Sequence, residues 1–195
     1  MNTELRIGLP EDAPPIHSLI AANVAGGHLL PRSLDDVELH AGRFIVALVD
    51  GAIIGCAELA PLSEHVAEVR SLVVDERWRG QRTGVNLVTA VADRARALGF
   101  LNVCAFTHQP SHFVRLGFSI VPHAWVPEKI AHDCAGCALF RRCGQYAVSL
   151  ALRKGAGLRL VEVAAVPRIA PAPRTSVERL RLPEDAVPDG MRVPA

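Results

Sequence analysis

This 195-residue chain has few lysines, almost no net charge and no long apolar run. Only two of its 21 basic residues are lysines, and 20 acidic residues leave a net charge of +1. Such a balance gives no electrostatic reason to expect nucleic acid or a membrane surface as a partner. No apolar run reaches the roughly 18 to 20 residues that a membrane-spanning helix needs. The sequence therefore argues against both a nucleic-acid partner and a membrane partner.

Signals for export and for a disulfide framework are also missing. The opening stretch MNTELRIGLPEDAPP has acids and prolines where a signal peptide has an apolar segment. Five cysteines, an odd number, do not fit a pure disulfide framework. We therefore expect a cytoplasmic protein, with one domain and at most an appendage at this length.

The first half of the chain contains clear turn and capping signals. Ser33 precedes two acids, as the N-cap of a helix does. Asp50-Gly51 separates two β-rich runs and is a favoured hairpin turn. The expected elements are a strand at 4–8, a helix to about 22, a helix at 33–41, two strands within 43–62 and a strand at 68–74.

The second half begins with the strongest helical pattern. Apolar residues recur at helical spacing from Thr83 to Leu98, and Gly99 follows as a C-terminal cap. The expected elements are this helix, a strand at 102–106, a helix at 110–116, a strand at 117–122, a cysteine-bearing loop at 130–145 and a strand at 146–152. This order predicts a mixed α/β sheet with one crossover helix.

The composition changes after Arg153. Residues 154–195 hold six prolines and no aromatic residue. An extended arm over the domain or a partner subunit and a mobile tail are both compatible with this composition. We therefore divide the chain into a domain at 1–153 and a proline-rich extension at 154–195.

A strand, a charged turn and a long helix follow one another at 68–98. This order gathers the free amide groups of residues 79–84 at the positive end of a helix, where a pyrophosphate can bind. Arg79 and Arg82 can add charge-assisted contacts. The turn is neither a P-loop nor a dinucleotide fingerprint, since Gly80 and Gly84 stand four apart without a third glycine. A plain strand–helix connection is the alternative.

The sequence on both sides of the turn favours a pyrophosphate site over a plain strand–helix connection. VRSLVVDERWRGQRTGVNLV, the helix end ARALGF and the later HFVRLGF resemble the GCN5-related N-acetyltransferase (GNAT) family. That family's turn reads Gln/Arg-x-x-Gly-x-Gly/Ala and binds the pyrophosphate of acetyl-coenzyme A (acetyl-CoA). Arg79 and Gly84 match its first and last positions. The resemblance covers residues 4–152 and implies a mostly antiparallel mixed sheet with flanking helices and a strand–pyrophosphate loop–helix cofactor site.

Within this family, three segments resemble the short N-acetylglutamate synthases: LLPRS at 29–33, EVRSLVV at 68–74 and DCAGCALFRRC at 133–143. The likeness implies acetylation of the α-amino group of an amino acid, glutamate first, as in arginine biosynthesis. Two departures keep alternatives open: Arg82 replaces the middle turn glycine, and Gly144-Gln145 replaces an expected acidic pair. The alternatives are another amine as acceptor, or a catalytically weak acetyl-CoA-binding subunit.

The resemblance also implies roles for individual residues. Acetyl transfer needs a base that deprotonates the ammonium, and Glu68 is the first candidate and Glu58 the second; a strand-end ion pair is the alternative for each. Many relatives carry at this point of the last motif a tyrosine that protonates the leaving thiolate. Phe113 stands at that position here, so no general acid is assigned. The backbone of 72–74 should pair with the pantetheine arm. The expected cofactor-binding residues are Leu72, Val73, Val74, Arg79, Gly80, Gln81, Arg82, Thr83 and Gly84.

An amino-acid acceptor needs partners for its carboxylates. Arg32 and Arg70 are the candidates because a guanidinium can bind a carboxylate in a bidentate manner, and His108 and Gln109 follow a strand that can line the same cleft. The loop His132-x-Cys-x2-Cys-x5-Cys offers a candidate structural zinc site at Cys134, Cys137 and Cys143, with reduced packing cysteines or a disulfide as alternatives. Dimers are common in the superfamily, so a homodimer is expected by analogy.

Overall fold

The computed structural model describes residues 3–24, 26 and 29–153. The extension at 154–195 lies outside the described residues, so the domain boundary stays a prediction. Within the described part, no helix is long and apolar enough to cross a bilayer.

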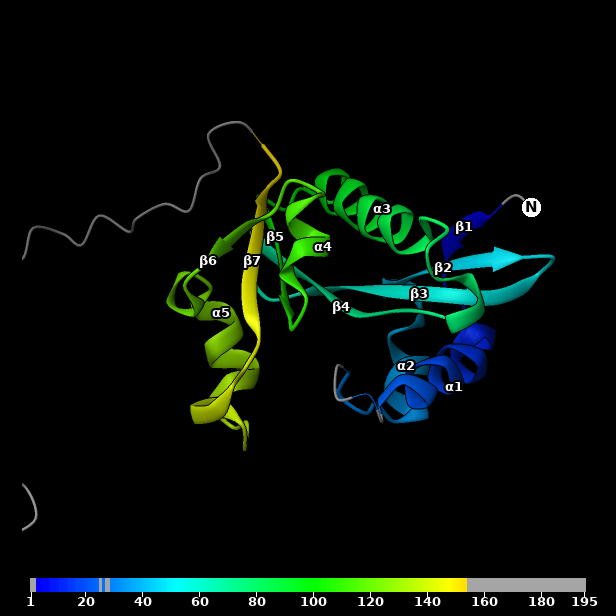
Figure 1. Cartoon of the computed structure of the whole chain (residues 1–195), viewed down its shortest axis with the longest axis horizontal. Coiled ribbons are helices and arrows are strands. Elements are labelled where there is room, and N and C mark those ends of the chain that lie inside the picture. The colour runs from blue at the N-terminus through cyan, green and yellow to red at the C-terminus, as the bar shows by residue number, and fades with distance from the viewer. Residues whose placement is uncertain (1–2, 25, 27–28, 154–195) are drawn as a thin grey trace, which may run out of the picture. The chain divides into compact units, whose positions relative to one another are not determined.

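A seven-stranded sheet forms the centre of the described part, in the order β1-β2-β3-β4-β5-β7-β6. All neighbouring strands are antiparallel except β4 and β5, which are parallel. The helix α3 (Thr83–Ala97) connects these two strands (Figure 1). This is the mixed, mostly antiparallel α/β sheet that the sequence predicted. Its strands are β1 (Glu4–Ile7), β2 (Phe44–Val49), β3 (Ala52–Pro61), β4 (Val66–Val74), β5 (Asn102–Thr107), β6 (Ser119–Val121) and β7 (Tyr146–Ala151).

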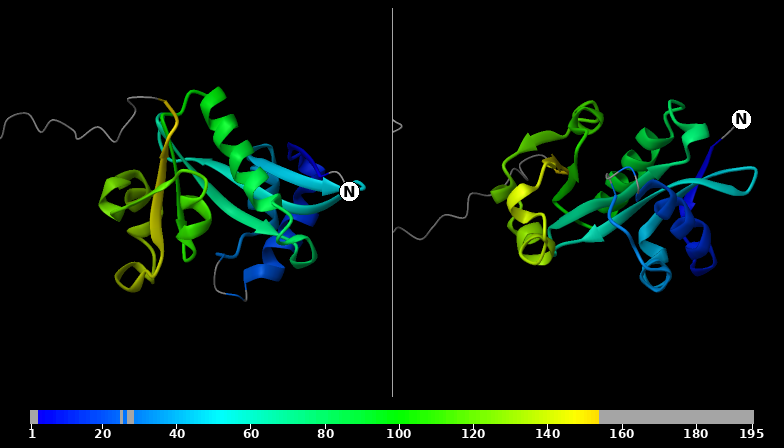
Figure 2. Two further views of the ribbon diagram at one scale, coloured as in Figure 1. Left: turned by 45° about the horizontal axis from the view of Figure 1, so that its top comes forward. Right: turned by 60° about the horizontal axis from the view of Figure 1, so that its bottom comes forward.

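Helices cover both faces of the sheet, with α1 and α2 on one face and α3 and α4 on the other (Figures 1 and 2). The remaining helices are α1 (Ala13–Val24), α2 (Leu34–Leu39), α4 (Pro110–Val114) and α5 (Pro127–Lys129). Short helical turns are η1 (Pro10–Asp12), η2 (Ala41–Arg43), η3 (Glu76–Trp78), η4 (His123–Trp125), η5 (Ile130–Cys134) and η6 (Phe140–Arg142).

The strand β2 lies between the two helical layers, and all six of its residues are buried. Successive side chains of a strand point to opposite faces. Ala47 therefore packs in the core that contains Leu87 of α3, whereas Val46 packs in the core that contains Ile16 of α1. Burial on both faces explains why this strand reads as a continuous apolar run.

Local signals predicted the turns and caps correctly. Asp50 and Gly51 have φ angles of 50° and 79°, the two left-handed residues that a tight hairpin turn requires. The Ser33 side chain accepts a hydrogen bond from the Asp36 amide at 3.2 Å and caps α2. Gly99 follows the end of α3 with φ 91°.

The region at 130–145 differs from the expected loop. The short helical turns η5 and η6 lie within it, and α5 leads directly into η5. Pro127 stands at the first helical position of α5, where its fixed φ favours helix and its missing amide hydrogen is not needed. Helical turns therefore place Lys129 and Asp133, four residues apart, on one side of the segment.

Candidate active site

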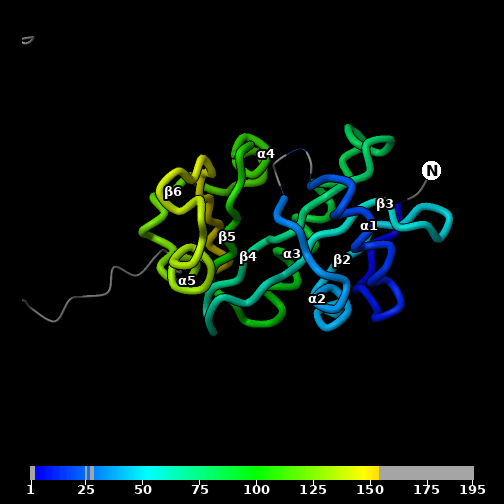
Figure 3. Tube along the Cα trace, turned by 90° about the horizontal axis from the view of Figure 1, so that it is seen from below, coloured from blue at the N-terminus to red at the C-terminus, as the bar shows by residue number. Residues whose placement is uncertain are grey.

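The strands β4 and β5 run side by side only at their starts. Val66–Glu68 pair with Asn102–Cys104, and β5 then stays paired with β7 along its whole length. Beyond Glu68, that edge of β4 has no strand partner within the described residues. A cleft of about 970 Å³ opens there, lined by β4, the ends of α1 and β5, α4 and residues of the 129–145 segment. Seen from below the sheet, α5 lies on one side of β4 and α1 with α2 on the other (Figure 3).

A β-bulge shapes the β4 wall of the cleft. Cys56 lies opposite Val73 and Glu58 lies opposite Arg70, so one residue of β3 faces two of β4. Ser71, inside the bulge, has φ 48°, and such a bulge bends the strand and interrupts its ladder. The backbone of 71–74 therefore borders the cleft with polar groups that a ligand of extended, amide-containing structure can pair with.

The turn before α3 has the backbone of an anion site. Gly80 and Arg82 have φ angles of 80° and 64°, while Gln81 between them is not left-handed. Such alternation turns successive N–H groups into one concavity, and the first amides of α3 have no intrahelical partner. The positive end of the helix dipole adds to the attraction for an anion. The described lining of the cleft includes Gly84 from this turn, but none of the residues 80–83.

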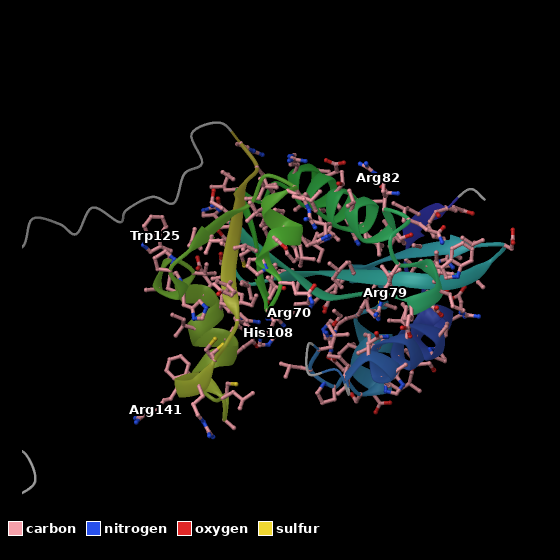
Figure 4. All side chains as sticks on the ribbon, viewed as in Figure 1. Arg70, Arg79, Arg82, His108, Trp125 and Arg141 are labelled. Atoms are coloured by element: carbon pink, nitrogen blue, oxygen red, sulfur yellow. The ribbon has the colours of Figure 1, made fainter. Side chains whose placement is uncertain are left out.

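The two arginines of the turn, Arg79 and Arg82, differ in whether they line the cleft. Arg79 lines the cleft and donates to the Val74 carbonyl at 3.2 Å and to Asn23 Oδ1 of α1 at 2.6 Å. Arg82 is exposed and does not line the cleft, and Figure 4 shows the two side chains well separated around the turn. Arg82 thus keeps the left-handed backbone that a glycine would adopt, with its guanidinium outside the cleft lining.

Arg32 is held by carboxylates on two elements. Its Nη1 lies 2.7 Å from Glu58 Oε2, its Nε bonds to Asp36, and its Nη1 approaches Ser71 Oγ at 3.4 Å. Burial disfavours the guanidinium charge, but the hydrogen bonds that Arg32 donates to Glu58 and Asp36 outweigh burial and raise the pKa of Arg32. Glu58 is only 2% exposed and does not line the cleft. Arg32 therefore connects a buried glutamate to the cleft.

A second network surrounds Glu68, which lines the cleft and is 3% exposed. One carboxylate oxygen lies 2.5 Å from Arg70 Nε, and both oxygens lie within 2.9 Å of Lys129 Nζ. Asp133 bonds to Arg70 and lies 2.8 Å from the same Lys129. Burial opposes the Asp133 charge, yet the hydrogen bond from Lys129 and the nearby cations lower the pKa of Asp133. Two acids and two bases thus form one electrically neutral cluster.

The remaining acceptor candidates also reach the cleft. His108 and Gln109 line it at the end of β5, and Figure 4 shows His108 beside Arg70. The His108 ring packs against Gly144, where an added Cβ would lie 3.7 Å from it. Phe113, at the expected position of an acid, is buried in the core. All four predicted acceptor residues, Arg32, Arg70, His108 and Gln109, therefore lie around one cavity.

Sequence reasoning missed several polar residues of the cleft, among them Asn23, His112, Lys129 and Asp133. Lys129 had one available signal, because it is one of only two lysines in a chain rich in arginine. Asn23 and Asp133 had none, because each meets an arginine that lies far away along the chain. Asp133, for example, meets Arg70 across 63 residues.

The candidate zinc site is not supported. Among the described residues, no group of three or more His, Cys, Asp or Glu side chains is arranged to hold a metal. Cys134 is half-buried in η5, Cys137 and Cys143 are exposed, and all three are free thiols. The Cys137 sulfur instead accepts a hydrogen bond from the Leu139 amide at 3.4 Å. The strand cysteines, Cys56 and Cys104, are buried.

The sequence matches the model of the acetyltransferase (GNAT) family over residues 17–118. The chain belongs to this family. It is therefore an acetyl-CoA-dependent N-acetyltransferase of GNAT type, as the resemblance implied. An uncharacterized N-acetyltransferase of Chlorobaculum tepidum is 30% identical over 137 residues, which are 70% of this chain and 88% of that protein. The amino-acid acetyltransferase of Aeromonas salmonicida is 32% identical over 57% of this GNAT chain, which spans only 26% of that enzyme.

Solved structures agree on the GNAT fold. The N-acetylglutamate synthase of Neisseria gonorrhoeae, complexed with coenzyme A and N-acetyl-glutamate, superposes with a TM-score of 0.70 at 24% identity, over 78% of this chain and 36% of that one. A Mycobacterium tuberculosis protein in complex with CoA superposes with a TM-score of 0.68 at 23% identity, over 77% and 99% of the two chains. At these identities the superpositions support the fold alone.

Proposed function

We propose that this GNAT enzyme acetylates the α-amino group of an amino acid, with glutamate as the preferred acceptor. The observation that carries the proposal is the presence of Arg32 and Arg70, from different elements, in the cleft beside the unpaired edge of β4. Guanidinium groups match carboxylates in geometry and charge. The amino-acid acetyltransferases among the relatives support the same acceptor class.

The site fits acetyl-CoA along one continuous path. We propose that the pantetheine arm lies along the backbone of 72–74 and that the pyrophosphate binds at the turn of 79–84, mainly through backbone amides. In this arrangement the thioester lies near the bulge at Ser71. An amide of β4 there is suitable to stabilise the oxyanion that develops at the thioester carbonyl.

The proposed chemistry is direct attack. The acceptor ammonium loses one proton, and the neutral amine attacks the thioester carbonyl. The C–S bond then breaks to release the coenzyme A thiolate, and the attacking nitrogen gives up a second proton, which passes through water to the thiolate. Glu68 is the proposed base, and Glu58 stays the second candidate. Because both Glu68 oxygens already accept bonds from Lys129 or Arg70, we propose that a water carries the proton to it.

An acceptor carboxylate can bind Arg70 only by replacing one of the protein carboxylates that Arg70 already contacts. Arg70 already donates to buried Glu68 and to Asp133. The Asp133 side chain is 37% exposed and keeps Lys129 as a second partner. Of the two, Asp133 is therefore the one that an acceptor carboxylate can replace at low cost.

The test is a coenzyme A release assay with acetyl-CoA and a panel of acceptors: glutamate, glutamine, aspartate, lysine and simple amines. We expect turnover with glutamate and a glutamate KM about tenfold higher in Arg70→Ala, since a charge-assisted hydrogen bond is worth about 1.5 kcal/mol or more. Asp133→Asn should instead lower the glutamate KM because it frees one side of Arg70. Neither change should alter coenzyme A affinity in calorimetry.

Arg96→Ala, at an exposed position of α3 outside the cleft, is the matched control. The two alternatives give different results. Turnover of an amine without a carboxylate, unaffected by Arg70→Ala, would replace the proposed acceptor. Coenzyme A binding without turnover of any acceptor would favour a catalytically weak regulatory subunit.

A further inference from the structure

One polar atom in the cleft has no partner among the described residues. His112 of α4 lines the cleft, and its Nε2 atom is buried without a hydrogen bond. Buried polar atoms in folded proteins are nearly always hydrogen-bonded, so each exception needs an explanation. A ligand that binds in this cleft is a direct one.

The surroundings of His112 place it on the proposed path of the cosubstrate. A Cβ added to Gly84 would lie 3.6 Å from His112 Cε1, 3.7 Å from Nε2 and 3.9 Å from Val74 Cγ2. The imidazole therefore lies where the end of β4 meets the first turn of α3. Even the methyl group of an alanine at position 84 would be in van der Waals contact with the ring.

This position is far from the reacting thioester. Ser71 lies three residues before Val74, and a strand rises about 3.3 Å per residue, so the bulge is about 10 Å away. The ring also favours its neutral form: burial, with a smaller effect of Arg115, lowers the pKa of His112. A polar contact with the Gly84 backbone opposes this lowering, but it does not reach hydrogen-bond geometry at Nε2. A neutral ring next to the helix start can donate one hydrogen bond from Nε2 to an anion.

We propose that His112 Nε2 donates a hydrogen bond to the pyrophosphate of the cosubstrate. This makes His112 a binding residue that GNAT membership and the turn motif do not assign. It acts on cosubstrate affinity and not on proton transfer to the thiolate. The proposal depends on acetyl-CoA as donor but not on the identity of the acceptor.

The decisive variant is His112→Leu, which keeps an apolar volume and removes the donor. Calorimetry should show coenzyme A and ADP, which share the pyrophosphate, each binding about tenfold more weakly. Binding of pantetheine, which lacks the pyrophosphate, should be unchanged. His112→Gln, whose amide can donate from a similar position, should recover most of the affinity. The KM for acetyl-CoA should rise while kcat stays within about twofold.

Stability separates this role from a structural one. Because His112→Leu removes a buried polar atom that lacks a partner, the variant should be at least as stable to urea as the parent. His65→Leu, at an exposed histidine outside the cleft, is the matched control. Unchanged coenzyme A affinity in both His112 variants would overturn the proposal. An equal loss of pantetheine affinity would also overturn it, because the contact would then be with the pantetheine arm. A fall in kcat without a change in affinity would overturn it as well.

Discussion

Replacing Arg82 by glycine should stabilise the protein and leave cosubstrate binding intact. Arg82 has φ 64° and ψ 3° at the start of α3. A left-handed conformation costs a non-glycine residue about 1–2 kcal/mol. Glycine removes that cost but loses about 0.4–1 kcal/mol through the larger entropy of the unfolded chain. The expected net gain therefore lies between about 0 and 1.6 kcal/mol, with a midpoint near 0.8 kcal/mol.

Urea unfolding of the two proteins measures this gain, and thermal unfolding should shift upward by about 2–4 °C per kcal/mol for a chain of this size. Gln81→Gly is the matched control. Gln81 is exposed in the same turn but is not left-handed, so its change should destabilise by about 0.4–1 kcal/mol. The two neighbouring substitutions are thus predicted to have opposite signs.

Binding supplies the second readout. The Arg82 guanidinium does not line the cleft, so coenzyme A affinity in Arg82→Gly should change by less than about threefold, under 1 kcal/mol. Destabilisation equal to that of Gln81→Gly would refute the left-handed assignment. A large loss of coenzyme A affinity would show that the arginine side chain, and not only the backbone of the turn, holds the phosphates.

Three further predictions concern the rest of the domain. A Cβ at Gly8 would lie 2.6 Å from the backbone oxygen of Ala41, so Gly8→Ala should destabilise by about 1–3 kcal/mol in urea unfolding, whereas Gly42→Ala, with open space around it, should not. The hydrogen bond from Arg6 lowers the pKa of Asp12, so stability should fall as pH drops below about 4, and Asp12→Asn should lose less between pH 7 and pH 3. Burial raises the pKa of both strand cysteines and also that of half-buried Cys134, so a thiol reagent at pH 8 should modify the two exposed thiols quickly, Cys134 more slowly and the strand thiols only on unfolding.

The fold was predictable because its signals are local. Asp50-Gly51 specifies a hairpin by its own dihedral preferences, and the apolar spacing after Thr83 specifies α3 within one segment. The turn residues Arg79 and Gly84 could be matched to the GNAT motif for the same reason, since they are contiguous with their strand and helix. By contrast, the helical turns η5 and η6 depend on weak local signals, and their region at 130–145 was expected as loop.

The partnerships inside the cleft were not predictable. Lys129 meets Glu68 across 61 residues, and Arg32 meets Glu58 across 26. Each pairing depends on where two distant segments lie over the sheet, which neither periodicity nor residue type specifies. Sequence reasoning therefore identified the charged residues but not which of them neutralise one another.

These partnerships also distinguish the two proposed bases. Glu58 and Glu68 are almost equally buried, at 2% and 3% exposure, so burial alone cannot rank them. Only Glu68 lines the cleft, whereas Glu58 reaches it through the guanidinium of Arg32. A proton from an acceptor amine would have to pass that cation to reach Glu58. We therefore propose Glu68 rather than Glu58 as the base, with Glu58 holding Arg32 in place at the cleft.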